Sequence, residues 1–523
     1  MTDALLRAVQ LAPRRTAAVA ADGTRRTWRE VHARVVRLAG ALTALGTRPG
    51  DRVVLAMANR PEYLECYFAC AWARLVAVPL NTRLSPDERR RYLDLVDPVL
   101  VVTDQDGEGD GGGPGTSARP VTVRRHGRGG PAPRAYADLL AGPPAERPVA
   151  GREDDPAALF GTGGTTGTPK AVVLTHRNIV TGSQHVQMAL SYRPSDLYLH
   201  AAPMFHIADF ASLLAVTQAG GGHAFTAPYR PHDFARRVER DGVTATLMVP
   251  TMVRALLDDP SATARDLSSW RLLFYGGAPM PPDLLREALT ALPCRLAQGY
   301  GMTEISLGAV LSERDHDHYA GRGGPLPARR LRGIGRAAPG VGLRINRPDH
   351  DGVGELQVSG PNVCAGYWRD EDATRRAFTE DGWCRTGDLA RMDEEGYVEL
   401  VDRLKDVVIT GGENVYSLEV ERVLSRHEAV AQVAVVGLPD VQWGERVHAV
   451  VVLRQDADPA GTPADLDRLA NGITAFARRT LAAYKVPRTV EFVEALPVTG
   501  PGKVDKKRLR KSRTPAHAES HTE

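Results

Sequence analysis

The sequence predicts an α/β protein with a large N-terminal domain of several subdomains and a smaller, mobile α+β C-terminal domain. Up to about Val341, short apolar runs alternate with segments of helical periodicity. This alternation is typical of parallel-rich sheets covered by helices. The pattern then changes to short strands and turns, which indicates a small β-rich unit. At 523 residues the chain is too long for one hydrophobic core, so two or more domains are expected.

The first elements follow from local patterns near the N-terminus. Residues 28–45 have helical periodicity, and Thr27 stands at the N-cap position. After a Gly-Asp turn, Arg52–Ala56 has the pattern of a buried strand, Pro61–Ala73 that of an apolar helix and Val76–Leu80 that of the next strand. Strand and helix therefore alternate as a parallel sheet requires.

Residues 105–134 interrupt this alternation. They are rich in Gly, Pro and Arg and poor in apolar residues, so we expect a mobile surface excursion. The alternation resumes after Asp155. The elements expected there are helices at 234–240, 251–257 and 282–292 and strands at 245–249 and 272–275.

A second change of pattern begins near Asp402 and introduces the C-terminal domain. The elements expected in it are helices at 417–424 and 464–481 and strands at 430–436, 447–453 and 489–493. We expect residues 1–402 to form the N-terminal domain, 403–406 a hinge, 407–510 a cap domain and 511–523 a disordered tail. About 110 residues are enough for such an independent domain.

Composition excludes several classes of protein. A net charge of +3 predicts neither a nucleic-acid-binding nor a membrane-surface protein. The five cysteines are few and lack zinc-ligand spacing, which fits a reducing cytosol. No signal peptide and no membrane-spanning run is visible. We therefore expect a cytoplasmic protein, as a monomer or a homodimer.

A loop rich in glycine and threonine is the most informative feature of the chain. Residues 159–170 read Leu-Phe-Gly-Thr-Gly-Gly-Thr-Thr-Gly-Thr-Pro-Lys and lie between two apolar runs that predict strands. Glycines let the backbone curl around an anion, threonines add hydroxyl donors, and Lys170 supplies a positive charge. We interpret the loop as a phosphate site. It differs from the usual P-loop because no Gly-Lys-Ser/Thr closes it, and a flexible linker is the alternative.

Further motifs follow this loop in a fixed order. They are Pro203–His206, Gly276–Pro279, Tyr300–Glu304, Thr386–Asp388, Arg403–Glu421 and Gly502–Lys503. Together with the Thr162–Lys170 loop they strongly resemble the adenylate-forming superfamily of acyl-CoA synthetases, adenylation domains and luciferases, over about residues 20–510. The resemblance implies that a carboxylate attacks the α-phosphorus of ATP, which gives an acyl-adenylate and pyrophosphate, and that a nucleophile then takes the acyl group.

The resemblance also implies roles in nucleotide binding. Glu304 with Thr303 would hold Mg²⁺, Tyr300 would stack on adenine, and Asp388 with Arg403 would bind the ribose. Otherwise Glu304 would be a helix-start carboxylate, Tyr300 a core residue and Asp388 a turn residue. The residues expected to bind the nucleotide or CoA are Thr162, Gly163, Gly164, Thr165, Thr166, Gly167, Lys170, Gly277, Ala278, Pro279, Tyr300, Gly301, Met302, Thr303, Asp388, Arg403, Lys405, Gly411, Gly412 and Glu413.

Four residues are expected to take part in catalysis: Lys503, Glu304, His206 and Lys170. By resemblance, Lys503 bridges the reacting carboxylate and the α-phosphate, although an exposed tail lysine is the alternative. His206 would lie beside the carboxylate, or else be a buried structural histidine. Lys405 matches the family's hinge position.

The second nucleophile and the acid are less well defined. The glycine-rich segment 410–416 resembles the element that CoA ligases bring in for thioester formation. The residues considered for the acyl pocket are Phe205, Ile207, Phe210, Tyr275, Gly276, Gly299, Met302 and Leu307, which allow an aromatic or medium-chain acid. Asp209 would either read a polar group of the substrate or face water at the rim.

We therefore predict an ATP- and Mg²⁺-dependent carboxylate–CoA ligase. The alternative is an adenylating enzyme whose nucleophile is an amine, a carrier-protein thiol or a small inorganic nucleophile. A catalytically silent nucleotide-binding or scaffold protein is the third interpretation. It is disfavoured because Lys170, Glu304, Asp388, Arg403 and Lys503 are all present.

Overall fold

The computed structural model describes residues 1–104, 120–126, 133–162, 169–319, 330, 333–454, 462–498 and 504–514. The chain divides into two compact units. Unit 1 consists of Met1–Arg344, Gln357–Arg385 and Asp393–Val398, and unit 2 of Ile345–Leu356, Thr386–Met392 and Glu399–Glu523. Within the described ranges, no helix combines the length and the apolar character that a membrane crossing requires.

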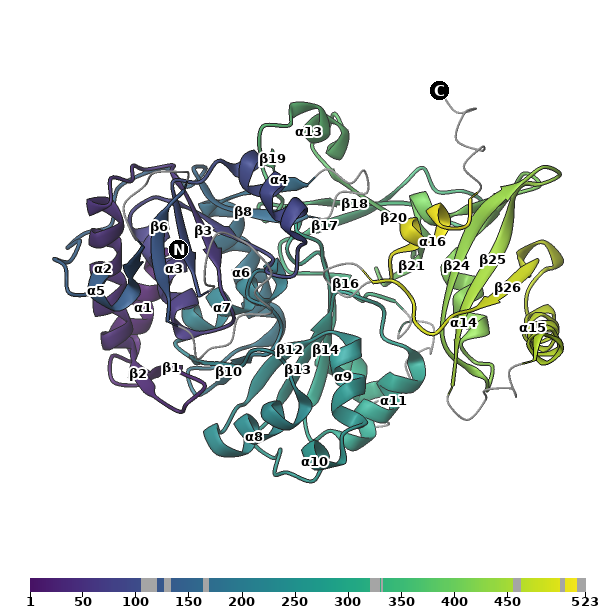
Figure 1. Cartoon of the computed structure of the whole chain (residues 1–523), viewed down its shortest axis with the longest axis horizontal. Coiled ribbons are helices and arrows are strands. Elements are labelled where there is room, and N and C mark those ends of the chain that lie inside the picture. Colours follow the sequence, from purple (N-terminus) through teal and green to yellow (C-terminus); the bar gives the residue numbers. More distant parts are fainter. Residues whose placement is uncertain are drawn as a thin grey trace. The chain divides into compact units, whose positions relative to one another are not determined.

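Unit 1 contains an eight-stranded sheet in the order β19-β9-β8-β4-β3-β5-β6-β7. Figure 1 labels β3, β6, β8 and β19 of this sheet. Its strands are β3 (Arg52–Ala56), β4 (Val76–Pro79), β5 (Leu100–Thr103), β6 (Thr122–Arg125), β7 (Arg134–Ala135), β8 (Pro156–Thr162), β9 (Lys170–Thr175) and β19 (Gly366–Tyr367). Successive side chains of β3 enter different cores, because a strand alternates its faces. Val53 and Leu55 pack with helices α2 (Trp28–Ala44) and α3 (Pro61–Trp72), whereas Val54 and Ala56 pack with α4 (Pro86–Val96).

A second sheet of unit 1 has nine strands in the order β16-β15-β14-β13-β12-β10-β11-β1-β2. Its strands are β1 (Thr16–Val19), β2 (Arg25–Thr27), β10 (Leu197–His200), β11 (Gly222–Phe225), β12 (Ala245–Met248), β13 (Leu272–Gly276), β14 (Arg295–Tyr300), β15 (Ala309–Leu311) and β16 (Arg336–Ala337). The strands from β1 through β11, β10, β12 and β13 to β14 are parallel. The carboxyl ends of β10, β13 and β14 therefore lie along one edge, each followed by a sequence motif.

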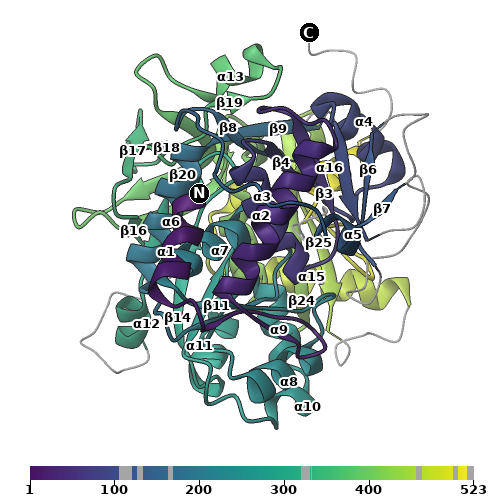
Figure 2. The same cartoon turned by 90° about the vertical axis from the view of Figure 1, so that its left-hand side faces the viewer.

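Helices cover both sheets, as Figure 1 shows for α8–α11 and Figure 2 for α1 and α2. The helices of unit 1 are α1 (Thr2–Leu11), α2 (Trp28–Ala44), α3 (Pro61–Trp72), α4 (Pro86–Val96), α5 (Tyr136–Leu139), α6 (His176–Leu190), α7 (Ile207–Ala219), α8 (Pro231–Asp241), α9 (Pro250–Leu257), α10 (Pro260–Thr263), α11 (Pro282–Ala291), α12 (Glu313–Tyr319) and α13 (Glu371–Ala377). The predicted α/β architecture is confirmed.

The start of α2 illustrates how local sequence sets these bounds. Thr27 Oγ1 accepts a hydrogen bond from the Glu30 amide, and the Glu30 carboxylate accepts one from the Thr27 amide at 2.7 Å. This reciprocal pair satisfies two amides that helix geometry leaves without partners. The predicted N-cap is confirmed.

The predicted surface excursion at 105–134 is partly wrong. Thr122–Arg125 forms β6, which pairs antiparallel with β5, and Arg134 lies in β7, which pairs with β6. Residues 105–119 and 127–132 lie outside the described part of the chain. Only Val123 of β6 is fully buried, so β6 and the edge strand β7 carry almost no hydrophobic signal in the sequence.

A four-stranded sheet in the order β17-β18-β20-β21 contains residues of both units. Its strands are β17 (Gly342–Asn346), β18 (Gly354–Ser359), β20 (Cys384–Met392) and β21 (Val398–Arg403). The β-rich pattern expected after Val341 is thereby confirmed.

Unit 2 has its own sheet, in the order β23-β22-β25-β24 with β26 beside β25. Its elements are the 3₁₀ helices Leu404–Asp406 and Ala483–Lys485, β22 (Val408–Thr410), β23 (Glu413–Val415), α14 (Ser417–Leu424), β24 (Val430–Asp440), β25 (Gly444–Leu453), α15 (Pro463–Arg478), β26 (Thr489–Phe492) and α16 (Lys506–Lys511). Lys511, where we expected a tail to begin, ends α16, and residues 515–523 lie outside the description. One core lies between the sheet and helices α14 and α15, and a smaller one lies beside Leu509 of α16.

Candidate functional site

The predicted phosphate loop joins the adjacent strands β8 and β9. These strands form an antiparallel hairpin in which Thr162 pairs with Lys170, and both residues are partly buried. The loop therefore leaves and re-enters the sheet at neighbouring positions. Its other predicted site residues lie outside the described part of the chain, namely Gly163, Gly164, Thr165, Thr166 and Gly167.

Tyr367 joins two of the predicted catalytic residues. It lies in β19, which pairs antiparallel with β9 beside the loop. The Tyr367 hydroxyl donates a 2.7 Å hydrogen bond to Oε1 of Glu304. The Lys170 ammonium lies 4.7 Å from the centroid of the Tyr367 ring, within cation–π range. Burial, followed by the Glu304 charge, raises the pKa of Tyr367, so the phenol stays protonated and can donate.

Sequence reasoning missed Tyr367 as a site residue. Its signal was the Gly366-Tyr367-Trp368 tripeptide, but a strand of two residues has no detectable period. The tyrosine is separated from Glu304 by 63 residues in the chain, and only the pairing of β19 with β9 reveals their proximity.

The Tyr300–Glu304 motif forms a turn directly after β14. Glu304 is 6% exposed and lies in this turn rather than at a helix start. Gly301 is required here, because a Cβ atom would collide with the Ser306 carbonyl oxygen. Tyr300, Met302 and Thr303 are partly buried beside it. The turn thus presents one carboxylate, one hydroxyl and an aromatic ring close together in sequence.

Two buried side chains, those of Asn59 and Tyr67, hold the segment that leads to His206. This histidine caps α7 at the end of the loop that follows β10. Asn59 donates to the carbonyls of His200 and Ala202 at 2.9 and 2.8 Å and accepts from the Met204 amide at 2.9 Å. Tyr67 donates to the Met204 carbonyl at 2.8 Å. Neither Asn59 nor Tyr67 was identified from the sequence.

Both sequence interpretations of Asp209 are wrong. Its side chain is fully buried, with one oxygen 2.6 Å from His200 Nδ1 and the other accepting from Tyr198 at 3.0 Å. His200 Nε2 lies 3.1 Å from His223 Nδ1, and His223 Nε2 lies 3.0 Å from Thr217 Oγ1. Asp209 therefore belongs to an internal polar network, and it neither faces water nor reads a substrate group.

The hydrogen bonds of this network fix which histidine nitrogens donate a proton and which accept one. Thr217 donates its hydroxyl proton to the Leu213 carbonyl, so His223 donates to Thr217 and accepts from His200. Burial lowers the pKa of His223, which keeps that ring neutral. Since His200 donates through Nε2, its bond to Asp209 carries a further proton, held as an imidazolium–carboxylate or an imidazole–carboxylic acid pair.

Several residues considered for an acyl pocket are core residues. Phe210 and Tyr275 are fully buried, and the Tyr275 hydroxyl lies 2.9 Å from His316 Nε2. The Phe274 ring fills the space in which Gly299 would carry a Cβ atom. Phe210, Tyr275 and Phe274 therefore belong to the hydrophobic cores of unit 1. Gly277, Ala278 and Pro279 form the loop after β13, with Gly277 and Pro279 exposed.

In unit 2, Asp388 and Arg403 form an ion pair. Arg403 Nε lies 2.9 Å from Asp388 Oδ1, and the Asp388 side chain is 6% exposed while that of Arg403 is 44% exposed. Asp388 lies in strand β20 rather than in a turn. Thr386 accepts from the Asp388 amide and donates to the Leu356 carbonyl. The carboxylate is thus fixed, whereas Arg403 reaches solvent.

Gly411 and Gly412 form the turn between β22 and β23. Both have positive φ, at 61° and 83°, which favours glycine over other residues. A Cβ atom at Gly411 would lie 2.8 Å from the Trp443 ring. The adjacent Glu413 is exposed.

Lys503 lies outside the described residues, but its flanks are defined. Val498 and Val504 form an antiparallel bridge on either side of it. Lys506 of α16 then lies 2.6 Å from Glu421 and 2.7 Å from Ser417. Arg510 donates to the Lys405 carbonyl at 2.8 Å. Within unit 2, the segment after Lys503 is therefore tied to the residues expected to form the hinge.

Two family models match the chain. The model of the AMP-binding enzyme covers residues 5–368, and that of the AMP-binding enzyme C-terminal domain covers residues 419–503.

Relatives match over nearly the full length. A feruloyl-CoA synthase from Amycolatopsis is 37% identical, with 97% of each chain covered. The fatty acid–[acyl-carrier-protein] ligase ScoC of Streptomyces coeruleorubidus is 35% identical over 95% of this chain and 93% of its own. A 2-succinylbenzoate–CoA ligase of Bacillus cereus (strain Q1) is 32% identical, with 98% of each covered.

Solved structures share the whole fold. ATP-bound MatB from Rhodopseudomonas palustris superposes with a TM-score of 0.81 at 29% identity, covering 97% of this chain and 98% of its own. The amide bond synthetase McbA from Marinactinospora thermotolerans gives a TM-score of 0.81 at 28% identity, covering 98% and 99%.

Proposed function

Because the chain belongs to the AMP-binding, adenylate-forming superfamily and to its AMP-forming acid–thiol ligase enzymes, we propose that it joins a carboxylic acid to CoA. The acid would first be converted to an acyl-adenylate with release of pyrophosphate, and CoA would then take the acyl group. The observation that carries this proposal is the Lys170–Tyr367–Glu304 series. Through Tyr367 it links the cation expected to bind phosphate with the carboxylate expected to bind the metal.

In this proposal the Thr162–Lys170 loop binds the β- and γ-phosphates. Lys170 stands at the base of the loop and would neutralise charge as an anionic carboxylate approaches a polyanion. Tyr300 would offer its ring to adenine, and Gly277–Pro279 would border the nucleotide. His206, held through Asn59 and Tyr67, would orient the reacting carboxylate.

The side chains beside Glu304 fit Mg²⁺. Only Oε1 of Glu304 accepts the Tyr367 hydrogen bond, and Thr303 adds a hydroxyl. Mg²⁺ in nucleotide sites uses one or two carboxylates and takes its other ligands from phosphate and water. When bound, the ion would neutralise charge on the phosphates.

Asp388 and Arg403 would bind the ribose. A fixed carboxylate accepts hydrogen bonds from two neighbouring hydroxyls, and the exposed guanidinium adds donors. Lys503 would supply the cation at the reacting carboxylate. Lys405, in the 3₁₀ helix Leu404–Asp406, would be the hinge residue of the cap domain.

CoA is the acceptor we favour. The feruloyl and succinylbenzoate relatives are named as CoA enzymes, and the glycine turn at Gly411–Gly412 is exposed. The alternative is another nucleophile, because one relative is named for an acyl carrier protein and one solved structure is an amide bond synthetase.

For the acid, we propose an aromatic or medium-chain carboxylate. Asp209 no longer favours a polar-substituted acid, since it is fully buried.

The cytoplasm is the compartment we propose. All five cysteines, each within the described residues, are buried, and none forms a disulfide. Unoxidised thiols suit a reducing compartment.

A trapping experiment tests the proposed function. Purified protein is incubated with ATP, Mg²⁺ and a panel of acids, and hydroxamate formation is measured with hydroxylamine. CoA-dependent release of AMP then identifies the acceptor. Lys170→Ala should lose roughly 10²-fold of the adenylation rate, whereas Arg177→Ala, at an exposed ion pair on α6, should retain it. If no acid of a broad panel supports pyrophosphate exchange in the unmodified protein, the proposal is wrong.

A further inference from the structure

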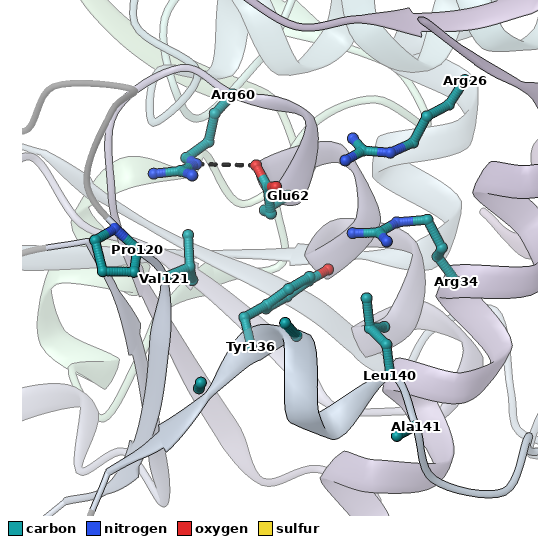
Figure 3. Close-up of a pocket in the computed structure, with 11 residues that line it drawn as sticks. Arg26, Arg34, Arg60, Glu62, Pro120, Val121, Tyr136, Leu140 and Ala141 are labelled. Atoms are coloured by element: carbon teal, nitrogen blue, oxygen red, sulfur yellow. Dashed lines mark hydrogen bonds and ion pairs between the residues drawn. The ribbon is translucent and has the colours of Figure 1, made fainter. Parts of the chain in front are cut away.

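Unit 1 contains a cavity of about 600 Å³ that none of the residues assigned to ATP or the acid lines. Its walls come from β2, α2, the start of α3, residues 120–121 and the segment around α5 (Figure 3). Three arginines point into this space, namely Arg26, Arg34 and Arg60. The side chains of Arg26 and Arg34 are 23% and 25% exposed, so each guanidinium group can donate to an acceptor that enters the cavity.

Arg26 and Arg34 share a single carboxylate. Arg34 Nε donates to Glu65 Oε1 at 2.6 Å, and Arg26 Nη1 lies 3.8 Å from that same oxygen. The other oxygen, Oε2, accepts from the Tyr136 hydroxyl at 2.6 Å. Glu65 itself is fully buried. Two positive charges therefore converge on one negative charge that is already hydrogen-bonded.

Arg26 is the less satisfied of the two arginines. Its side chain is 23% exposed, and across the described residues its guanidinium makes no hydrogen bond, since 3.8 Å exceeds hydrogen-bond range. Among the residues that the structure describes, Arg34 donates side-chain hydrogen bonds only through Nε, and its two terminal nitrogens point toward the cavity. Arg60 differs, because it faces both Glu62 at 2.9 Å and Asp104 at 3.6 Å. Counting Glu65 as well, three carboxylates face the three arginines, and the Glu62 charge also interacts with Arg34 and Arg26. What distinguishes the Arg26–Arg34 side is its unused hydrogen-bond donors.

The remaining walls limit what can enter. The Tyr136 ring, Val121 and Leu140 are apolar surfaces, and Glu62 lies across the cavity from Arg26 and Arg34. A carboxylate or a phosphate group has several acceptor oxygens and could accept hydrogen bonds from both planar guanidinium groups at once. A short organic body would then contact the tyrosine ring.

We propose that this cavity binds a compact organic oxyanion, a carboxylate or a phosphate ester, through Arg26 and Arg34. The ligand accepts hydrogen bonds from the Arg26 guanidinium and from the terminal nitrogens of Arg34. The site lies outside the proposed catalytic residues, so ligand binding here is independent of the adenylation proposal.

The test compares two arginine variants by titration calorimetry. Malate and glycerol 3-phosphate are titrated into the full chain and into Arg26→Gln and Arg29→Gln. Arg29 lies on the same helix as Arg34, is exposed and does not line the cavity. Arg26→Gln should weaken binding about tenfold, the effect of one charge-assisted contact, while Arg29→Gln should leave it unchanged. Arg26→Lys should retain more of the affinity than Arg26→Gln.

The two probes distinguish the source of the oxyanion. Tighter binding of malate identifies a carboxylate ligand, and tighter binding of glycerol 3-phosphate identifies a phosphate ester. Binding that Arg26→Gln leaves unaltered would place the anion at another site, such as the nucleotide site, and overturn the proposal. Absence of saturable binding of either probe would also overturn it.

Discussion

The Tyr367 hydroxyl donates a hydrogen bond to the Glu304 carboxylate, while the face of the same ring lies beneath the Lys170 ammonium. One side chain thus contacts both a carboxylate and a cation of the proposed site. The carboxylate is 6% exposed, so its orientation depends on this donor. Tyr367 is therefore a positioning residue for Glu304.

Replacing Tyr367 by Phe should weaken the response to Mg²⁺. The ring and its contact with Lys170 remain, but Glu304 loses the donor that fixes its rotamer. A hydrogen bond to a charged group contributes about 1.5–3 kcal/mol, so we expect the Mg²⁺ concentration for half-maximal pyrophosphate exchange to rise about tenfold. Direct titration of Mn²⁺ with ATP present, followed by electron paramagnetic resonance, should show the same weakening.

Tyr229→Phe is the matched control for this variant. The Tyr229 hydroxyl donates to the Met252 carbonyl at 2.9 Å, so its loss removes one hydroxyl bond elsewhere in unit 1. It should lower stability by about 1 kcal/mol and leave the Mg²⁺ response unchanged. An equal Mg²⁺ response in Tyr367→Phe and the unmodified enzyme would show that Glu304 does not need this donor.

Asp209 should matter for stability and not for the choice of acid. Asp209→Ala leaves His200 and Tyr198 without their buried acceptor, which should cost about 3 kcal/mol of unfolding free energy. Asp209→Asn should be tolerated far better, because its oxygen can accept from Tyr198 and its amide can donate to a neutral His200. Urea unfolding measures the change in stability, and adenylation assays with a panel of carboxylic acids measure the ranking of substrates. A changed ranking of acids in a stable Asp209→Asn protein would contradict this assignment.

The regular elements of the chain were predictable because their signals are local. The helix at Ser417–Leu424 and the strand at Arg52–Ala56 have the predicted bounds, since periodicity and flanking turn residues define both. The roles of Lys170, Glu304 and Asp388 stay predictions, which were possible because each residue lies within a run of characteristic sequence.

What the sequence did not reveal depends on pairing between distant segments. β6 and β7 carry little apolar content and are held by backbone pairing with β5. Tyr367 reaches Glu304 only because β19 pairs with β9. Asp209 looked like a pocket residue because a carboxylate in an apolar helix has no local partner. Its partners, His200 and Tyr198, lie on a neighbouring strand.

Low pH should destabilise unit 1 partly through protonation of His176 in the unfolded chain. Burial, followed by the charges of Arg74 and the N-terminus, lowers the pKa of His176 from 6.5 to about 4. The unfolded chain therefore binds this proton more readily, so stability falls as the pH drops from 6.5 towards 4. At pH 5 the loss from this group is about 2 kcal/mol.

His176→Gln tests this pH dependence. Between pH 7 and pH 5 the variant's unfolding free energy should fall about 2 kcal/mol less than that of the unmodified protein, as measured by urea denaturation. His350, which is 88% exposed, provides the control, and His350→Gln should keep the original slope. Parallel curves for His176→Gln and the unmodified protein would mean that His176 titrates normally.

Lys503→Ala should reduce adenylation far more than it affects folding. The residue lies in the segment between Val498 and Val504, whose bridge brings the ends of that segment together, and α16 behind it is anchored through Lys506 to Glu421. Those anchors remain in the variant, so its melting temperature should be unchanged. Loss of the cation at the reacting carboxylate should slow pyrophosphate exchange roughly 10²-fold. The control is Lys511→Ala, which removes an exposed lysine of α16 and should exchange normally. CoA-dependent consumption of a supplied acyl-adenylate should persist in Lys503→Ala, because that step no longer needs charge neutralisation between carboxylate and ATP. Near-normal pyrophosphate exchange by Lys503→Ala would show that this lysine does not act in adenylation.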